Sequence, residues 1–81
     1  MEAQRQREHA WATVARPSDL GAFLRAQRVA QEWTQDELAA ELGITRQYLH
    51  EIEQGKPSLY TERLFAVLRE LGLTLRIEAT R

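Results

Sequence analysis

The chain has 81 residues, which is enough for one small domain but too short for an ordinary large enzyme. Apolar residues make up 43% of it and charged residues 28%, no apolar run approaches the length of a membrane span, and there is no cysteine for disulfides or thiolate metal sites. The formal net charge of −1 excludes the broadly basic surface that often accompanies nucleic-acid binding. We therefore expect a soluble, cytoplasmic protein with one core, no membrane association and no secretory signal.

Residues 1–17 form a polar leader in which Trp11 and Val14 are the main apolar side chains. No pattern in the leader compels a fold, and it is compatible with a frayed helix, an arm, or a segment that orders on a partner. The compact domain is expected over residues 18–72, and a short C-terminal segment follows at residues 73–81.

The first helix is predicted to begin at Pro17-Ser18-Asp19 and to run to about Gln31. Ser or Asp can accept hydrogen bonds from the unpaired amides of a first helical turn. Apolar side chains then follow at helical spacing, at Leu20, Phe23 and Leu24.

The second helix is predicted over Gln35–Leu42. Thr34 with Glu37 three residues later has the form of a capping box, in which each residue satisfies an amide of the other. Gly43 ends this helix by supplying the left-handed backbone conformation that a tight turn needs. Its inner face should carry Leu38, Ala39 and Leu42.

The third helix is predicted from Arg46, capped by Thr45, to about Gln54. Leu49 and Ile52 form its apolar stripe, and the breaker Gly55-Lys56-Pro57-Ser58 follows. The second and third helices thus have the spacing of a helix-turn-helix, whose second helix protrudes and fits the major groove of DNA. The plainer alternative is that these apolar positions are the core of any small helical bundle.

A fourth helix is predicted from about Tyr60 to Leu71, ending at Gly72. We expect it to turn four apolar side chains inward, namely Leu64, Val67, Leu68 and Leu71.

The last segment alternates apolar and polar residues, with Leu73, Leu75 and Ile77 on one side, which is typical of a half-buried strand. A strand needs a hydrogen-bonding partner. Within the chain the candidate is the weak stretch Ala10–Ala15, so the same strand of a second copy is the preferred mate.

Trp33-Thr34-Gln35 through Glu53-Gln54-Gly55-Lys56 resembles the Xre-type helix-turn-helix family, and the similarity covers about Leu20–Leu71. The resemblance implies an all-α, lambda-repressor-like helical bundle that binds double-stranded DNA as a homodimer at a palindromic operator. One departure is Glu32, which replaces the small or glycine residue common at the end of the first helix.

The fourth helix and the strand after it are more narrowly similar to the HipB-like antitoxins. This similarity implies an autorepressing transcriptional regulator of a toxin-antitoxin system, with a HipA-like kinase toxin as a further partner. A stand-alone repressor remains a second interpretation.

The family resemblance assigns DNA contacts to the start of the second helix and to both ends and the outer face of the third. Gln35 is expected on a phosphate, Gln47 on a base edge, Arg46 on a base edge or a phosphate, and Lys56 on the backbone as the most salt-sensitive contact. The full expected set is Gln35, Arg46, Gln47, Tyr48, His50, Glu51, Gln54 and Lys56.

Other residues are expected to be structural. Arg28 and Glu53 match a pair that bridges the first and third helices in this family, while Ala39 and Gly43 allow the two motif helices to approach and turn. Dimerisation is assigned to Leu73, Leu75 and Ile77.

Three classes of function remain open from the residues. An enzyme is the weakest, because no catalytic constellation, metal-ligand cluster or cofactor-binding loop is present, and His50 has no nucleophile beside it. A protein-protein interaction module is the alternative, since residues 35–56 carry a net charge of −3. DNA binding is favoured by the exposed positions of Gln35, Arg46, Gln47 and Lys56.

Overall fold

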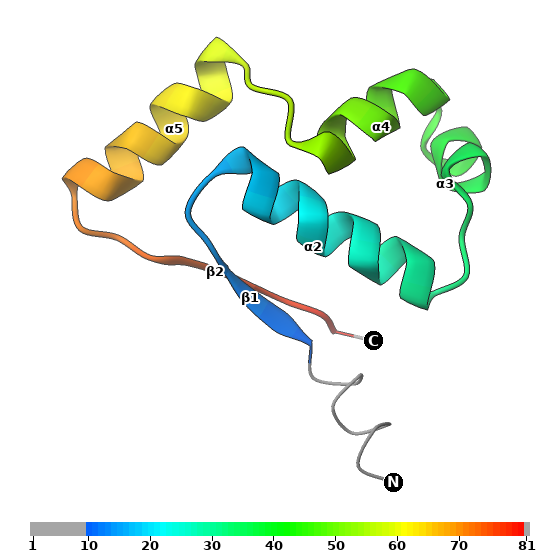
Figure 1. The fold of residues 1–81 in the computed structure, drawn as a ribbon, viewed down its shortest axis with the longest axis horizontal. Helices are drawn as coiled ribbons and strands as arrows, with labels where there is room; N and C mark the ends of the chain where they lie inside the picture. The colour runs from blue at the N-terminus through cyan, green and yellow to red at the C-terminus, as the bar shows by residue number, and fades with distance from the viewer. Residues whose placement is uncertain (1–9, 81) are drawn as a thin grey trace, which may run out of the picture.

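The computed structural model describes residues 10–80, which form four helices and a two-stranded sheet (Figure 1). The elements in chain order are β1 (Trp11–Val14), α2 (Pro17–Ala30), α3 (Gln35–Leu42), α4 (Arg46–Gln54), α5 (Leu59–Glu70) and β2 (Leu75–Glu78). The central helix α2 contacts α4, α5 and β1. The predicted fold class, a helical domain with a helix-turn-helix, is confirmed; residues 1–9 of the predicted leader lie outside the described residues.

The motif helices α3 and α4 have the bounds that the sequence predicts. The Thr34 hydroxyl accepts from the Glu37 amide at 3.0 Å, and the Glu37 carboxylate accepts from the Thr34 amide at 2.9 Å. The Thr45 hydroxyl accepts from the amide of Tyr48 at 3.0 Å and so caps α4. Gly43 has φ of 69°, which is the left-handed conformation expected of it. The turn between the helices is therefore defined by local chemistry.

The packing of α2 against α4 depends on a glycine. Gly21 is buried, and a Cβ there would collide with the backbone carbonyl groups of Ile52 and Glu53. Ala39 and Leu49 are buried beside this contact, at 3% and 5% exposure. The three helices α2, α3 and α4 thus form one closely packed unit, which we call the motif unit.

The sheet corrects the preferred pairing of the C-terminal strand. β2 pairs antiparallel with β1 of the same chain, and Val14 lies opposite Leu75. Val14 is buried at 3% exposure, and on the other face the Arg76 guanidinium stacks 4.1 Å from the centre of the Trp11 ring. Ala12 is a weak strand former, but Val14 is buried on one face of β1 and Trp11 stacks with Arg76 on the other. The backbone of β2 is therefore paired without a second copy.

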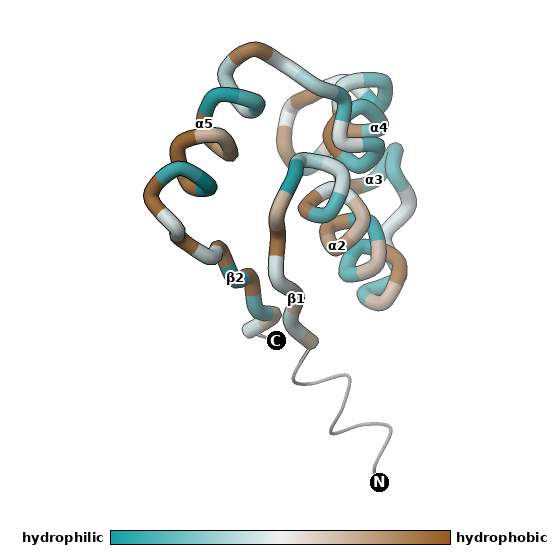
Figure 2. Tube along the Cα trace, turned by 60° about the vertical axis from the view of Figure 1, so that its left-hand side comes forward, coloured by the Kyte–Doolittle hydropathy of each residue, from teal (hydrophilic) through white to brown (hydrophobic). Residues whose placement is uncertain are grey.

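The orientation of α5 also differs from the prediction. Phe65 is buried and Leu68 is half-buried, whereas Leu64, Val67 and Leu71 are exposed. Apolar residues lie on two faces of this helix, and the chain covers the face that carries Phe65. Hydrophobic stretches are accordingly visible along α5 in Figure 2.

Apolar side chains are also exposed after α5. Of the residues assigned to dimerisation, Leu73 and Leu75 are exposed and Ile77 is half-buried. Leu42, the last residue of α3, is also mostly exposed rather than inside. Among the described residues the buried apolar side chains are Val14, Ala39, Leu49 and Phe65, at 3 to 5% exposure.

Candidate nucleic-acid interface

A buried ion pair joins α2 to the end of α4. The Nε and Nη2 atoms of Arg28 donate to the two carboxylate oxygens of Glu53 at 2.6 and 3.1 Å, and Nη1 donates to the Trp33 carbonyl at 2.7 Å. The side chains of Arg28 and Glu53 are only 9% and 1% exposed. Burial by itself raises the pKa of Glu53, but hydrogen bonds from Arg28 and Gln35 and the charge of Arg28 more than offset it, so the pKa is lowered.

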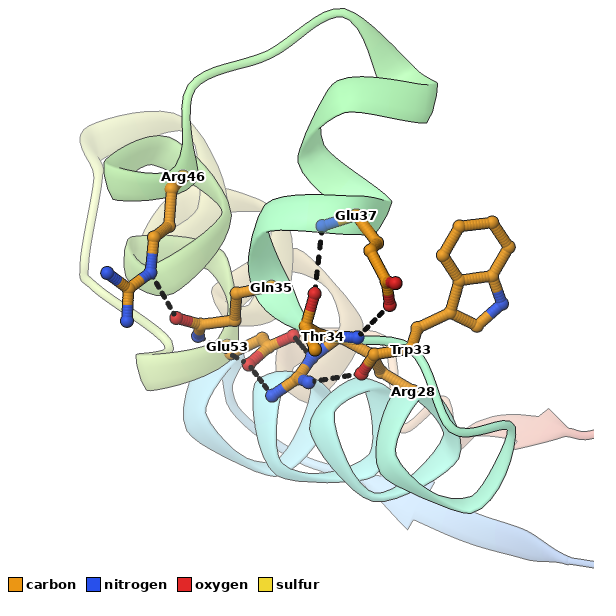
Figure 3. A network of polar contacts seen from close by, with 7 residues as sticks. All are labelled: Arg28, Trp33, Thr34, Gln35, Glu37, Arg46 and Glu53. Carbon is orange, nitrogen blue, oxygen red and sulfur yellow. Dashed lines mark hydrogen bonds and ion pairs between the residues drawn. The ribbon is translucent and has the colours of Figure 1, made fainter.

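Gln35 continues this network to the surface (Figure 3). Its Nε2 donates to Glu53 at 2.9 Å, and its Oε1 accepts from Nε of Arg46 at 3.4 Å. The network runs from buried Arg28 through Glu53 and Gln35 to exposed Arg46 at the start of α4. In this arrangement a phosphate would meet the second Nε2 hydrogen of Gln35 and the amides at the N-terminus of α3.

A hollow of about 530 Å³ opens beside this network. It is lined by Arg25, Arg28, Trp33, Thr34, Gln35, Asp36, Arg46, His50 and Gln54. Three arginines line it against one aspartate. Arg28 is paired with Glu53 and Arg46 with Asp36, so the charges of these five groups sum to +1, and the charge beyond the two pairs is that of Arg25. A chain of net charge −1 therefore carries a small local excess of positive charge at the N-terminus of α3.

The outer face of α4 holds most of the expected groove-reading residues. Gln47, His50 and Gln54 are exposed, and a smaller hollow of about 240 Å³ brings Gln47 and His50 together with Gln35 and Arg46. These side chains come from the beginnings of two helices that a single turn holds together. The arrangement offers adjacent donors and acceptors to a base edge and a phosphate.

The other side of α4 borders a more apolar groove of about 370 Å³, lined in part by Tyr48, Ile52 and Phe65. Tyr48 and Lys56 line this groove, whereas His50 and Gln54 line the hollow beside the ion pair.

Glu51 accepts hydrogen bonds from two residues that are predicted to contact DNA, Gln47 and Lys56. Its carboxylate accepts from Nε2 of Gln47 at 3.2 Å and from Nζ of Lys56 at 3.3 Å. The hydrogen bond from Gln47, followed by that from Lys56, lowers the pKa of Glu51.

Two residues at this surface, Arg25 and Asp36, were not predicted from the sequence. Arg25 lies one helical turn before Arg28, so the i, i+3 spacing on α2 is the signal that would have placed it at the same hollow. Asp36 forms an ion pair with Arg46, with 3.8 Å between Oδ1 and Nε, and only the fold of the turn brings these two residues together.

The described part of the chain holds no group of three or more His, Cys, Asp or Glu residues placed to bind a metal ion. Within residues 10–80, no helix combines the length and apolar character needed to cross a bilayer.

Residues 24–77 match the model of a helix-turn-helix family. The chain belongs to this helix-turn-helix family. It is 35% identical, over 66 residues, to a protein of Sinorhizobium fredii (strain NBRC 101917 / NGR234) named uncharacterized HTH-type transcriptional regulator y4mF. The matched segment covers 82% of this chain and 87% of that relative. No solved structure matches the chain significantly.

Proposed function

We propose that this helix-turn-helix protein is a sequence-specific DNA-binding transcriptional regulator that inserts α4 into the major groove. The observation that carries the proposal is the exposed row Arg46, Gln47, His50 and Gln54 beside a locally basic hollow. The name of the Sinorhizobium relative supports the same class of function.

The roles of the individual residues follow from their positions. Gln47 and Arg46 reach base edges, Arg25 and the N-terminus of α3 hold one phosphate, and Lys56 holds another on the far side of α4. The buried network below Gln35 limits the rotamers of the side chains at the surface, which lowers the entropy cost of ordering them on DNA.

The experiment is fluorescence anisotropy of a labelled duplex taken from upstream of the protein's own gene, compared with a random duplex, at 50 and 200 mM salt. We expect tighter binding to the upstream duplex and a loss of about 10- to 100-fold for Gln47→Ala, as for one bidentate base contact. Gln31→Ala, an exposed glutamine at the end of α2, is the matched control. Equal binding of both duplexes by wild type and Gln47→Ala would exclude groove reading by α4.

The proposal includes a two-fold homodimer, which places two copies of α4 in successive major grooves roughly 34 to 36 Å apart on a palindromic operator. It is supported by the exposed stripe Leu64, Val67 and Leu71 on α5 and by Leu73 after it, which we call the apolar stripe. A core of so few buried side chains leaves a small domain marginal, and a second copy would cover the stripe. Joining two weak half-site modules also raises the effective concentration of the second.

A narrower proposal is that the protein is an antitoxin that represses its own operon and binds a HipA-like kinase toxin. It is supported by the similarity of α5 and the following strand to HipB-like antitoxins. Co-expression with the product of the adjacent gene tests it: rescue of growth from a kinase-like product, and a co-purifying complex, would support it. An adjacent product that is harmless and does not bind would favour a stand-alone repressor.

A further inference from the structure

Two cations that we place on DNA are already paired with carboxylates of the same chain. Nε of Arg46 lies 3.8 Å from Oδ1 of Asp36, and Nζ of Lys56 lies 3.3 Å from Oε2 of Glu51. The pairs stand at opposite ends of α4, one at its first residue and one just beyond its last turn. Both face the surface, with Arg46 67% and Lys56 64% exposed.

The geometry points to Asp36 and Glu51 as internal competitors of DNA phosphate, which lower sequence-independent affinity and its dependence on salt. The inference rests on the proposed DNA-binding function. Each carboxylate occupies the position of an anion beside a cation that a phosphate would otherwise contact.

Competition between carboxylate and phosphate should change the salt dependence of DNA binding. A free lysine or arginine that contacts DNA displaces roughly 0.9 of a condensed cation, and this release sets the salt dependence of binding. When Lys56 exchanges Glu51 for a phosphate, the carboxylate is left without its partner and attracts a cation from solution. The net release, and with it the affinity gained at low salt, is therefore smaller.

Glu51 has a second consequence because it also accepts a hydrogen bond from Gln47. The hydrogen bonds from Gln47 and Lys56 favour its ionised form, as the lowered pKa indicates. One carboxylate thus restrains both a groove-reading side chain and a backbone-binding side chain in the free protein. To bind DNA, Gln47 and Lys56 must each leave Glu51 or donate to Glu51 and a DNA group at once.

The test compares full-length wild type, Glu51→Gln and Asp36→Asn for binding to a random-sequence 30-base-pair duplex, by anisotropy across 50 to 250 mM salt. We expect each substitution to raise affinity about 3- to 10-fold at 50 mM. We also expect the slope of log affinity against log salt to steepen by roughly 0.9 for each substitution and roughly twice that for the double variant.

Glu70→Gln is the control for net charge, because it removes one carboxylate in the last turn of α5, away from α4 (Figure 1). The Debye length is about 10 Å at 0.1 M salt and somewhat longer at 50 mM, so this variant should change binding much less than Glu51→Gln or Asp36→Asn does. Thermal unfolding of Asp36→Asn checks that α3 still forms, because Asp36 lies in its first turn.

Several outcomes overturn the inference. If both variants keep the wild-type affinity and slope, or bind the random duplex more weakly, the carboxylates position Arg46 and Lys56 and do not compete with phosphate. If Glu70→Gln produces the same gain, the effect belongs to net charge alone. A wild-type protein that binds no duplex even at 50 mM salt contradicts the proposed function itself, which is a distinct result.

Discussion

The motif unit is more closely packed within the chain than the segment from α5 to β2. The motif unit has side-chain caps on α3 and α4, a close contact between α2 and α4, and a buried ion pair between Arg28 and Glu53. Along α5 one face is covered by the chain while the other carries exposed Leu64, Val67 and Leu71. The motif unit is thus held together by contacts within the chain, whereas α5 and the segment after it leave apolar side chains exposed, which the proposed dimer would cover.

The largest effect is expected from breaking the ion pair of the motif unit. Glu53→Gln should lower the free energy of unfolding by about 3 kcal/mol or more, because it leaves the Arg28 guanidinium buried without its counter-charge. Urea unfolding measures the loss. The paired replacement Arg28→Met with Glu53→Leu should recover part of it.

The same pair should give stability a defined pH dependence. Because the folded-state pKa of Glu53 is lowered, its contribution is complete above about pH 4.5, the ordinary value, and is lost as the pH falls through the folded-state pKa. Wild type should therefore lose stability below about pH 4.5. The corresponding decline should be shallower in Glu53→Gln, and equal slopes for the two proteins would show that Glu53 titrates normally.

The next effect concerns the contact between α2 and α4. Gly21→Ala should cost about 2 to 3 kcal/mol, since the added methyl group meets backbone carbonyl groups that cannot move as side chains do. Ala22→Gly, at the exposed neighbouring position of the same helix, is the control and should cost only about 1 kcal/mol through helix propensity. An unfolding midpoint for Gly21→Ala equal to that of wild type would contradict the close packing.

A substitution on α5 should change the assembly of the protein without changing the fold of the motif unit. Val67 is 53% exposed, so Val67→Glu should leave the helical content of the protein nearly unchanged while it shifts the assembly from dimer to monomer. Sedimentation velocity measures the assembly, with Ala66→Glu as the control at an exposed position beside the stripe. A wild-type protein that sediments as a monomer would remove the proposed dimer. Deleting residues 73–81 is a poorer test because it also removes the partner of β1.

The smallest effect is a gain in stability at the end of α2. Glu32 has φ of 65°, a conformation that glycine adopts without strain, so Glu32→Gly should stabilise the protein by about 0.5 to 1 kcal/mol. The departure from the family pattern noted in the sequence thus has a physical cost. Thermal unfolding tests it, and Glu32→Ala, which keeps the strain, should show no comparable gain.

Local rules predicted α3, α4 and the turn between them, whereas α2 begins at Pro17 without the side-chain cap expected from Ser18 or Asp19. Thr34, Thr45 and Gly43 act through neighbours within four residues, so their effect on helix bounds can be read without knowing the fold. The pairing of Arg28 with Glu53 came from the family resemblance, because its members are 25 residues apart.

The segment from α5 to β2 was predicted less well, because its packing depends on residues far away in the sequence. Apolar residues on both sides of α5 specify a helix but not which face the chain covers, and that choice depends on where Phe65 meets its neighbours. Likewise, the alternation after Gly72 predicted a strand, but its pairing with the short strand Trp11–Val14 depends on contacts between distant parts of the chain. Asp36 was missed because only the folded turn places it beside Arg46, whereas the i, i+3 spacing of Arg25 and Arg28 on α2 could have indicated Arg25.

The most direct test of DNA reading by α4 is hydroxyl-radical footprinting of the full-length protein on the DNA upstream of its gene. The account predicts two protected patches on one face of the duplex, separated by about one helical turn, with protection lost in Gln47→Ala under the same conditions. Uniform weak protection along the whole duplex, identical for wild type and Gln47→Ala, would contradict it.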